Sequence, residues 1–283
     1  MKVQPTISVT REEAFGPGSP IVVFDRVSLA FDERVILRNV SFTLIMGHTK
    51  VVIGASGAGK STILKLILGL LRADEGVIWV NGERVDQMTE RQMMRVRAEL
   101  GMVFQEGALF DSLDVRENVG YRLYEDGSMP DEEIGRVVLR LLSFVGLEDA
   151  IDKMPAELSG GMKRRVGIAR ALVGTPRLVL YDEPTAGLDP ITKRTIVDLM
   201  IKLRDVEGVT TVFVTHDLQA AATVASEYAE TAPDGRIVFR RGGDNLCLLN
   251  VECIMLEDGH ISFEGRYEDL MSSQLPFVRT FVA

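Results

Sequence analysis

The segment that most constrains the fold is the eight-residue run Gly-Ala-Ser-Gly-Ala-Gly-Lys-Ser at positions 54–61. It fits the pattern G-x-x-x-x-G-K-[ST], in which glycines let successive backbone N–H groups point at one anion. An apolar run at 50–53 precedes it, and an apolar segment of helical length follows from about 60 to 70. A strand, a glycine-rich turn and a helix are the context in which such a loop binds phosphate.

The loop and the first helical turn supply the candidate phosphate ligands. Lys60 is expected to reach the β- and γ-phosphates, the Ser61 hydroxyl to take a place on Mg²⁺, and Thr62 to add a phosphate contact. A glycine-rich turn without a ligand is the alternative. The backbone candidates are Gly54, Ser56, Gly57, Ala58 and Gly59.

Two further apolar runs, at 178–181 and 211–214, indicate buried strands. Buried strands that alternate with helices predict a parallel sheet with helices on both faces and ligands beyond the carboxyl ends of its strands. Earlier runs at 21–24, 28–31 and 41–44 favour an antiparallel β region. The tail, 252–265, is typical of a hairpin that turns at Asp258-Gly259.

Polar residues follow both buried strands at the end where ligands bind. Asp182 is expected to hold Mg²⁺, and Glu183 to orient or deprotonate an attacking water. The alternative is that both carboxylates are only solvated at a strand end. His216, which follows the strand at 211–214, is a candidate for a γ-phosphate contact or a structural histidine.

Composition excludes several classes of function. The 283 residues carry a formal net charge of −9, which disfavours nucleic acid as a partner. No apolar run reaches the roughly 18 residues of a membrane span, and no signal peptide is visible. Cys247 and Cys253 form neither a disulfide framework nor a zinc site and are expected to be strand residues. Any membrane function then needs another chain to span the bilayer.

One more motif points to a family. Leu158-Ser159-Gly160-Gly161-Met162 resembles the ABC signature LSGGQ, with Met162 in place of glutamine. With the phosphate loop and both acidic strand ends in the right order, the chain resembles the ATP-binding subunit of ABC transporters from about residue 21 to its end.

The resemblance implies a fold, an activity and its cofactors. The fold is α/β, a P-loop NTPase of ABC type, with a mixed-sheet core, an antiparallel β subdomain and an inserted helical subdomain. Residues 1–20 are then a flexible lead-in and 21–283 a single ATPase domain. Within it, 21–105 and 159–283 form a RecA-like core with the β subdomain, and 106–158 the helical subdomain. ATP and Mg²⁺ are the implied cofactors.

The same resemblance implies a head-to-tail dimer. Ser159, Gly160 and Gly161 would hold the γ-phosphate of ATP bound to a second copy of the chain. A small hydroxyl residue and glycine N–H groups at a helix N-terminus form an anion site. Asp189 would communicate across the dimer.

Three single residues match other family positions. Phe31 stands where an aromatic ring, usually tyrosine, stacks on adenine, and a phenylalanine ring offers the same π face. Gln105 would touch Mg²⁺ or the water and link to the membrane partner, and His216 would be the switch histidine of catalysis.

Residues 104–110, 157–165 and 189–192 resemble the ATPase of Mla-type, Mkl-like phospholipid transport systems. The implied partners are an MlaE-type permease in the membrane and an MCE-domain lipid-binding protein. The implied location is peripheral, at the cytoplasmic face of the inner (plasma) membrane. The alternatives are a motor for another cargo, such as amino acids or lipoproteins, and an ABC protein that acts on DNA or ribosomes.

Two regions keep alternative interpretations. Leu109 and Phe110 either face a groove for a short permease helix or pack in the core. Residues 226–250 predict an extra hairpin and loop, whose Arg240 and Arg241 either meet a partner or lipid headgroups or are simply solvated.

Overall fold

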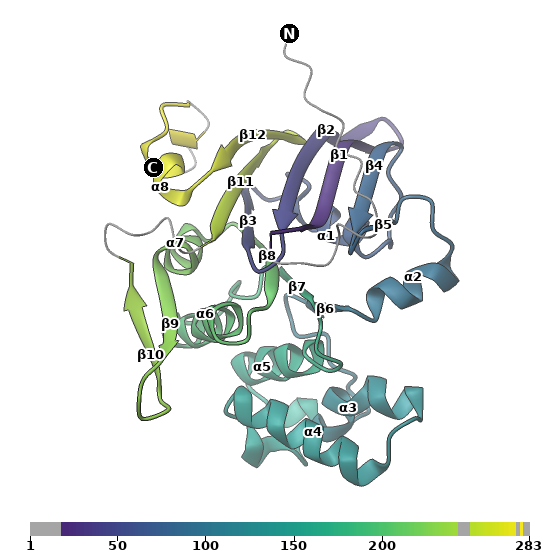
Figure 1. Ribbon diagram of the computed structural model, residues 1–283, viewed down its shortest axis with the longest axis vertical. Helices are drawn as coiled ribbons and strands as arrows, with labels where there is room; N and C mark the ends of the chain where they lie inside the picture. Colours follow the sequence, from purple (N-terminus) through teal and green to yellow (C-terminus); the bar gives the residue numbers. More distant parts are fainter. Residues whose placement is uncertain (1–17, 243–249, 276–277, 280–283) are drawn as a thin grey trace.

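The computed structural model describes residues 18–242, 250–275 and 278–279. A six-stranded sheet with the strand order β12-β11-β3-β8-β7-β6 forms the centre (Figure 1). All neighbouring pairs in it are parallel except β11 with β12. Its strands are β3 (Thr49–Gly54), β6 (Leu100–Val103), β7 (Leu178–Asp182), β8 (Thr210–Thr215), β11 (Val251–Glu257) and β12 (His260–Gly265).

A second, antiparallel sheet has the order β2-β1-β4-β5. It consists of β1 (Pro20–Phe31), β2 (Arg34–Ile45), β4 (Glu75–Val80) and β5 (Glu83–Arg84). The two strands expected at 21–24 and 28–31 are one strand. A bulge between Asp25 and Ser28, with Arg26 at φ 50°, shifts the register there and interrupts the alternation along β1.

Alternate residues of the central strands enter two different cores. Val51 and Ile53 of β3 pack with the core beside α5, α6 and α7, and Val52 packs with the core beside α1 and the antiparallel sheet. Layers therefore cover both faces of the sheet, and the expected α/β class with a mixed central sheet is confirmed. These helices are α1 (Lys60–Ile67), α5 (Gly160–Ala171), α6 (Pro190–Asp205) and α7 (Leu218–Ser226).

The expected helical region hangs below the sheet in Figure 1. Residues 106–158 contain α3 (Val115–Asp126), α4 (Asp131–Phe144) and two 3₁₀ turns, Glu148–Ala150 and Pro155–Glu157. Asp114 and Glu117 form a capping box at the start of α3. The short α2 (Glu90–Arg97) precedes β6. The subdomain boundaries at 105 and 159 stay predictions.

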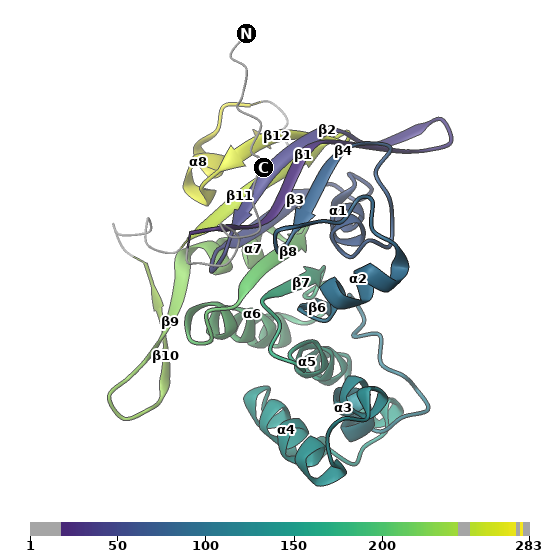
Figure 2. The same cartoon turned by 45° about the vertical axis from the view of Figure 1, so that its right-hand side comes forward.

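A two-stranded ribbon, β9 (Glu227–Thr231) and β10 (Ile237–Arg241), lies within the region expected to hold an extra hairpin. It projects beside α6 in both views (Figures 1 and 2). Ala229 is buried against the core, and Arg240 forms an ion pair with Glu230 at 2.5 Å. The positive charge of Arg240 is therefore paired with a carboxylate within the ribbon. Residues 243–249 lie outside the described residues.

The chain ends in the expected hairpin and the short helix α8 (Tyr267–Ser272). Asp258 and Gly259 form the turn between β11 and β12 with φ of 45° and 79°. Cys253 is a buried residue of β11, whereas Cys247 lies outside the described residues. Across the described ranges, no helix combines the length and apolarity needed to cross a bilayer.

Gly101→Ala tests the contact of β6 with α5. A Cβ at Gly101 would lie 2.4 Å from the Ala171 carbonyl oxygen, so we expect a loss of about 1–3 kcal/mol in the free energy of unfolding, measured in urea. Gly135→Ala is the control. It lies within α4 with only Arg116 Nη1 nearby, at 3.7 Å, so it should gain roughly 0.5–1 kcal/mol. Equal stability of the two variants would contradict this account.

Candidate functional site

The phosphate loop connects the end of β3 to the start of α1. Neighbouring backbone atoms lie so close to two of its glycines that neither could carry a side chain. A Cβ at Gly59 would lie 2.9 Å from the carbonyl oxygen of Ile36, and one at Gly54 would lie 2.7 Å from that of Leu256. Gly59 also has φ 98°, which disfavours any other residue. The β1–β2 hairpin and β11 therefore enclose the loop from both sides.

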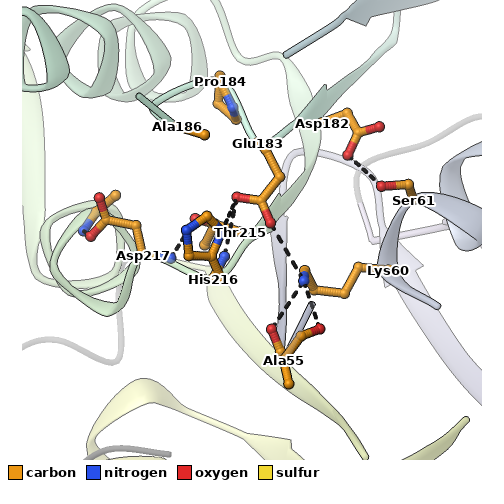
Figure 3. Close-up of polar contacts among 12 residues, drawn as sticks. Ala55, Lys60, Ser61, Asp182, Glu183, Pro184, Ala186, Thr215, His216 and Asp217 are labelled. Atoms are coloured by element: carbon orange, nitrogen blue, oxygen red, sulfur yellow. Dashed lines mark hydrogen bonds and ion pairs between the residues drawn. The ribbon is translucent and has the colours of Figure 1, made fainter. Parts of the chain in front are cut away.

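Lys60 places a buried ammonium group inside this loop. Its Nζ donates to the carbonyl oxygens of Gly54 at 3.0 Å and Ala55 at 3.1 Å, and lies 3.4 Å from Glu183 Oε1 (Figure 3). Its side chain is only 7% exposed. Two neutral acceptors and one carboxylate thus hold a positive charge where the loop would receive an anion.

Ser61 and Asp182 meet across the gap between α1 and β7. The Ser61 hydroxyl donates to Asp182 Oδ1 at 2.7 Å. Burial raises the pKa of the Asp182 carboxyl above its ordinary value, and the Ser61 hydrogen bond opposes this. A hydroxyl and a carboxylate are oxygen ligands that suit Mg²⁺, which uses one or two carboxylates together with substrate phosphates.

Glu183 lies between two positively charged or polar groups. One carboxylate oxygen is 3.4 Å from Lys60 Nζ, and the other is 2.8 Å from His216 Nδ1 and accepts from the His216 backbone N–H at 3.2 Å (Figure 3). Its φ is 48°, a left-handed conformation that costs roughly 1–3 kcal/mol and recurs at active sites. The carboxylate is consequently fixed in direction beside the phosphate loop.

His216 follows β8 and is set in place by the start of α7. The Thr215 hydroxyl accepts from the Asp217 N–H at 2.9 Å, and the Asp217 carboxylate caps α7 by accepting from Gln219 and Ala220. Lys193 pairs with that carboxylate at 2.7 Å. The structure thus brings five predicted residues into one cluster with Glu183 at its centre. They are Lys60, Ser61, Asp182, Glu183 and His216.

The signature residues form a separate site at the start of α5. The Ser159 hydroxyl caps this helix and accepts from the Met162 N–H at 3.3 Å. A Cβ at Gly161 would lie 2.3 Å from Thr192 Cγ2, whereas the nearest atom to one at Gly160 is Leu188 Cδ2, at 3.9 Å. Gly161 therefore serves the packing of α5 on α6, and Gly160 leaves the helix N-terminus open to an incoming anion.

The other predicted residues lie outside both groups. Phe31 is 47% exposed at the end of β1, and Gln105 is exposed just beyond β6. Asp189 caps α6 by accepting from the backbone N–H groups of Ile191 and Thr192. No hydrogen bond connects any of these three side chains to Glu183 or Lys60 within the described residues.

The structure adds two arginines that the motifs did not assign. Arg34 is the cross-strand partner of Phe31, and its Nη2 lies 3.8 Å from the place of a Cβ on Gly57. Arg164 is buried and donates to the carbonyl oxygens of Pro184 and Ala186. The double arginine at 164–165 was visible in the sequence, but only as a mark of resemblance.

Residues 37–186 match the family model described as "ABC transporter". The chain belongs to the ABC transporter family. It is 40% identical over 212 residues to the intermembrane phospholipid transport system ATP-binding protein MlaF of Escherichia coli K12, covering 75% of this chain and 78% of MlaF.

Other members of the ABC transporter family are similar as well. The methionine import ATP-binding protein MetN of Carboxydothermus hydrogenoformans is 40% identical over 200 residues, covering 71% of this chain and 59% of MetN. The dimeric, post-hydrolysis ATP-binding cassette MJ0796 bound to ADP and Pi has a TM-score of 0.71 and 30% identity, covering 87% of this chain and 98% of that one. The chain is accordingly an ABC ATPase, as its motifs predicted.

Asp182→Asn tests the electrostatic environment of the site. The folded chain holds the Asp182 proton more tightly than the unfolded chain, so burying the charge lowers stability as pH rises above the ordinary pKa of 3.8. Asparagine keeps the acceptor for Ser61 without the charge. We expect Asp182→Asn to melt at a higher temperature than the natural protein at pH 7, with the difference shrinking towards pH 4.

The control is Asp234→Asn, because a hydrogen bond from Arg236 lowers the pKa of that carboxyl. It contributes stability at neutral pH that is lost in acid, so its replacement should change the melting temperature in the opposite direction. An Asp182→Asn protein that melts below the natural one at pH 7 would contradict the assigned burial effect.

Proposed function

We propose that this ABC ATPase is the motor subunit of a transporter for phospholipid or a related hydrophobic substrate. Two copies close on two Mg·ATP and open after hydrolysis. The observation that carries the hydrolytic part is the Glu183 carboxylate, held between Lys60 and His216 and next to the Ser61–Asp182 pair.

Nucleotide binding would use the loop and the β1–β2 hairpin. Backbone N–H groups from Gly54 to Gly59, and the Thr62 hydroxyl, would face the phosphates with Lys60, while Phe31 would stack on adenine. The exposure of Phe31 and the position of its partner Arg34 against Gly57 support a base and phosphate site on this side of the loop. Ser56 and Ala58 complete the proposed cradle.

Ser61 and Asp182 would hold Mg²⁺, with Gln105 as a further ligand to the ion or the water. The ion, when bound, neutralises charge that develops on the β- and γ-phosphates. Glu183 would take a proton from the attacking water, and His216 would orient Glu183 and contact the γ-phosphate. The His216 Nδ1 contact to Glu183 supports this pairing of roles.

The second copy would complete each site. Ser159, Gly160 and Gly161 present a capped, open helix N-terminus that lies apart from the Lys60 cluster, so both can act on one nucleotide only between two chains. Asp189, exposed at the start of α6, would contact the partner copy. The dimeric state of MJ0796 supports this arrangement for a protein of the same fold.

The cargo proposal rests on the MlaF resemblance and on residues 104–110, 157–165 and 189–192. It implies an MlaE-type permease, an MCE-domain lipid-binding protein and a peripheral location at the cytoplasmic face of the inner membrane. MetN, at the same identity, keeps amino acids as the second candidate cargo. A tagged pull-down in mild detergent with lipid extraction decides: a permease with phospholipid supports the proposal, and an amino-acid permease contradicts it.

Glu183→Gln tests the hydrolytic assignment. Loss of a positioned general base typically lowers turnover by roughly 10²–10⁴. We expect the variant to bind ATP, to dimerise in its presence and to release phosphate at this reduced rate. Phosphate release at saturating ATP and light scattering of the dimer measure both effects. Normal turnover would refute the role of Glu183.

The proposed permease contact is a groove beside the Gln105 segment. Its lining includes Met94, Phe104, Phe110 and Tyr121. Phe110 is 43% exposed and its ring lies 4.6 Å from that of Tyr121, whereas Leu109 packs against the core. Phe110 therefore lines the groove, whereas Leu109 packs against the core.

Phe110→Glu tests this contact. A charge in the apolar groove should prevent docking of a permease helix, so the variant should lose co-purification with the permease while the isolated subunit keeps its ATPase and melting temperature. Leu139→Glu is the control, because Leu139 is 48% exposed on α4 and does not line the groove. If Phe110→Glu still co-purifies fully, the groove is not the docking site.

A further inference from the structure

Arg164 connects the signature helix α5 to the turn that carries Glu183. Its Nη1 donates to the Pro184 carbonyl oxygen at 2.8 Å, and its Nη2 to that of Ala186 at 2.5 Å. The two contacts lie on either side of Thr185. One guanidinium therefore fixes the peptide groups that immediately follow the catalytic candidate.

Arg164 is buried, at 7% exposure, and makes no ion pair within the described residues. Burial lowers the pKa of its guanidinium, and the charge of Glu106 acts in the opposite direction. A buried cation satisfied by neutral carbonyls is unfavourable unless its hydrogen bonds are well made. The planar fork of arginine matches two acceptors at once, which a lysine ammonium does not.

The turn that Arg164 holds is strained and short. Glu183 has φ 48°, and its carbonyl oxygen accepts from the Ala186 N–H at 3.1 Å. Such conformations persist only where the surroundings determine them. Arg164 contacts this turn from outside, so the backbone that follows Glu183 is held by α5. Lys60 and His216 contact the Glu183 carboxylate itself.

The same helix contacts the Gln105 segment through neighbouring positions. Gly167 lies where a Cβ would be 3.2 Å from the Gly107 Cα, and Arg170 Nη2 donates to the Gly107 carbonyl oxygen at 2.9 Å. Residues 164, 167 and 170 are spaced by three and share one face of α5. One helix face thus contacts both the groove segment and the turn of Glu183.

We propose that Arg164 is a positioning residue that keeps Glu183 aligned between Lys60 and His216 and ties this alignment to the position of α5. The proposal rests on the proposed role of Glu183. It adds to that role a route by which a partner bound at the groove changes hydrolysis without touching nucleotide.

Arg164→Gln and Arg164→Lys test the proposal in the full chain. A misplaced catalytic group costs up to about 100-fold in rate, so Arg164→Gln should lower kcat by roughly 10- to 100-fold. The KM for ATP should stay within about twofold, because uniform nucleotide binding is untouched. The kcat of Arg164→Lys should lie between those of the natural protein and Arg164→Gln, because lysine keeps the positive charge but cannot donate to both carbonyl oxygens as the planar guanidinium does.

Arg165→Gln is the matched control. Arg165 is the next residue of α5 and donates to the carbonyl oxygens of Val145 and Gly146 at 3.1 and 3.2 Å, away from Glu183. It should keep kcat even if it lowers the melting temperature. Equal losses of kcat in the Arg164→Gln and Arg165→Gln proteins would overturn the proposal, as would a normal kcat in Arg164→Gln.

A double-mutant cycle separates this proposal from the role of Glu183. If Arg164 acts through Glu183, adding Arg164→Gln to Glu183→Gln should change the remaining rate by less than about twofold. Additive losses would show that Arg164 acts elsewhere and refute the proposal. Normal turnover of Glu183→Gln alone would instead refute the hydrolytic assignment, so the two failures are distinguishable.

Discussion

The parallel register of β3, β8 and β7 is the constraint from which the site follows. Asp182 pairs with Val214, and Ile53 pairs with Thr215, so the three strands end at one level of the sheet. The residues that follow each strand meet there because parallel strands share a carboxyl edge. Lys60, Glu183 and His216 come from three segments that are distant in the sequence, yet each follows directly or closely after the end of its strand.

The site combines electrostatic and backbone features that cost free energy. A buried ammonium, a carboxyl whose pKa is raised by burial and a left-handed glutamate lie next to one another. None of these features would be selected for stability alone, because each costs free energy unless a neighbour compensates. Compensation comes from the helices outside the cluster. The Arg164 guanidinium of α5 donates to the turn after Glu183, the Lys193 ammonium of α6 pairs with Asp217, and backbone N–H groups of α7 donate to Asp217 beside His216.

The sequence was sufficient to predict the elements whose chemistry is local. The glycine-rich loop, the acidic end of β7 and the turn at Asp258-Gly259 depend on residue type and spacing within a few positions. The sequence was not sufficient to predict features that depend on packing between segments far apart in the chain. The bulge that merges two runs into β1 was not visible in the pattern, and β6 is too short to stand out. The sequence showed Arg164 only as part of a motif, and its contact with the Pro184 carbonyl oxygen became visible only in the structure.

The β9–β10 ribbon lies apart from the two larger sheets. Only one of its faces packs on the core, and β10 pairs only with β9 among the described strands, so its outer edge carries backbone groups that none of those strands satisfies. Exposed edges of this kind invite unwanted pairing between molecules. Arg241, an exposed residue next to the Arg240–Glu230 ion pair, adds a positive charge to this edge strand and discourages such pairing. The charged end of β10 therefore disfavours strand pairing between copies of the protein along this edge.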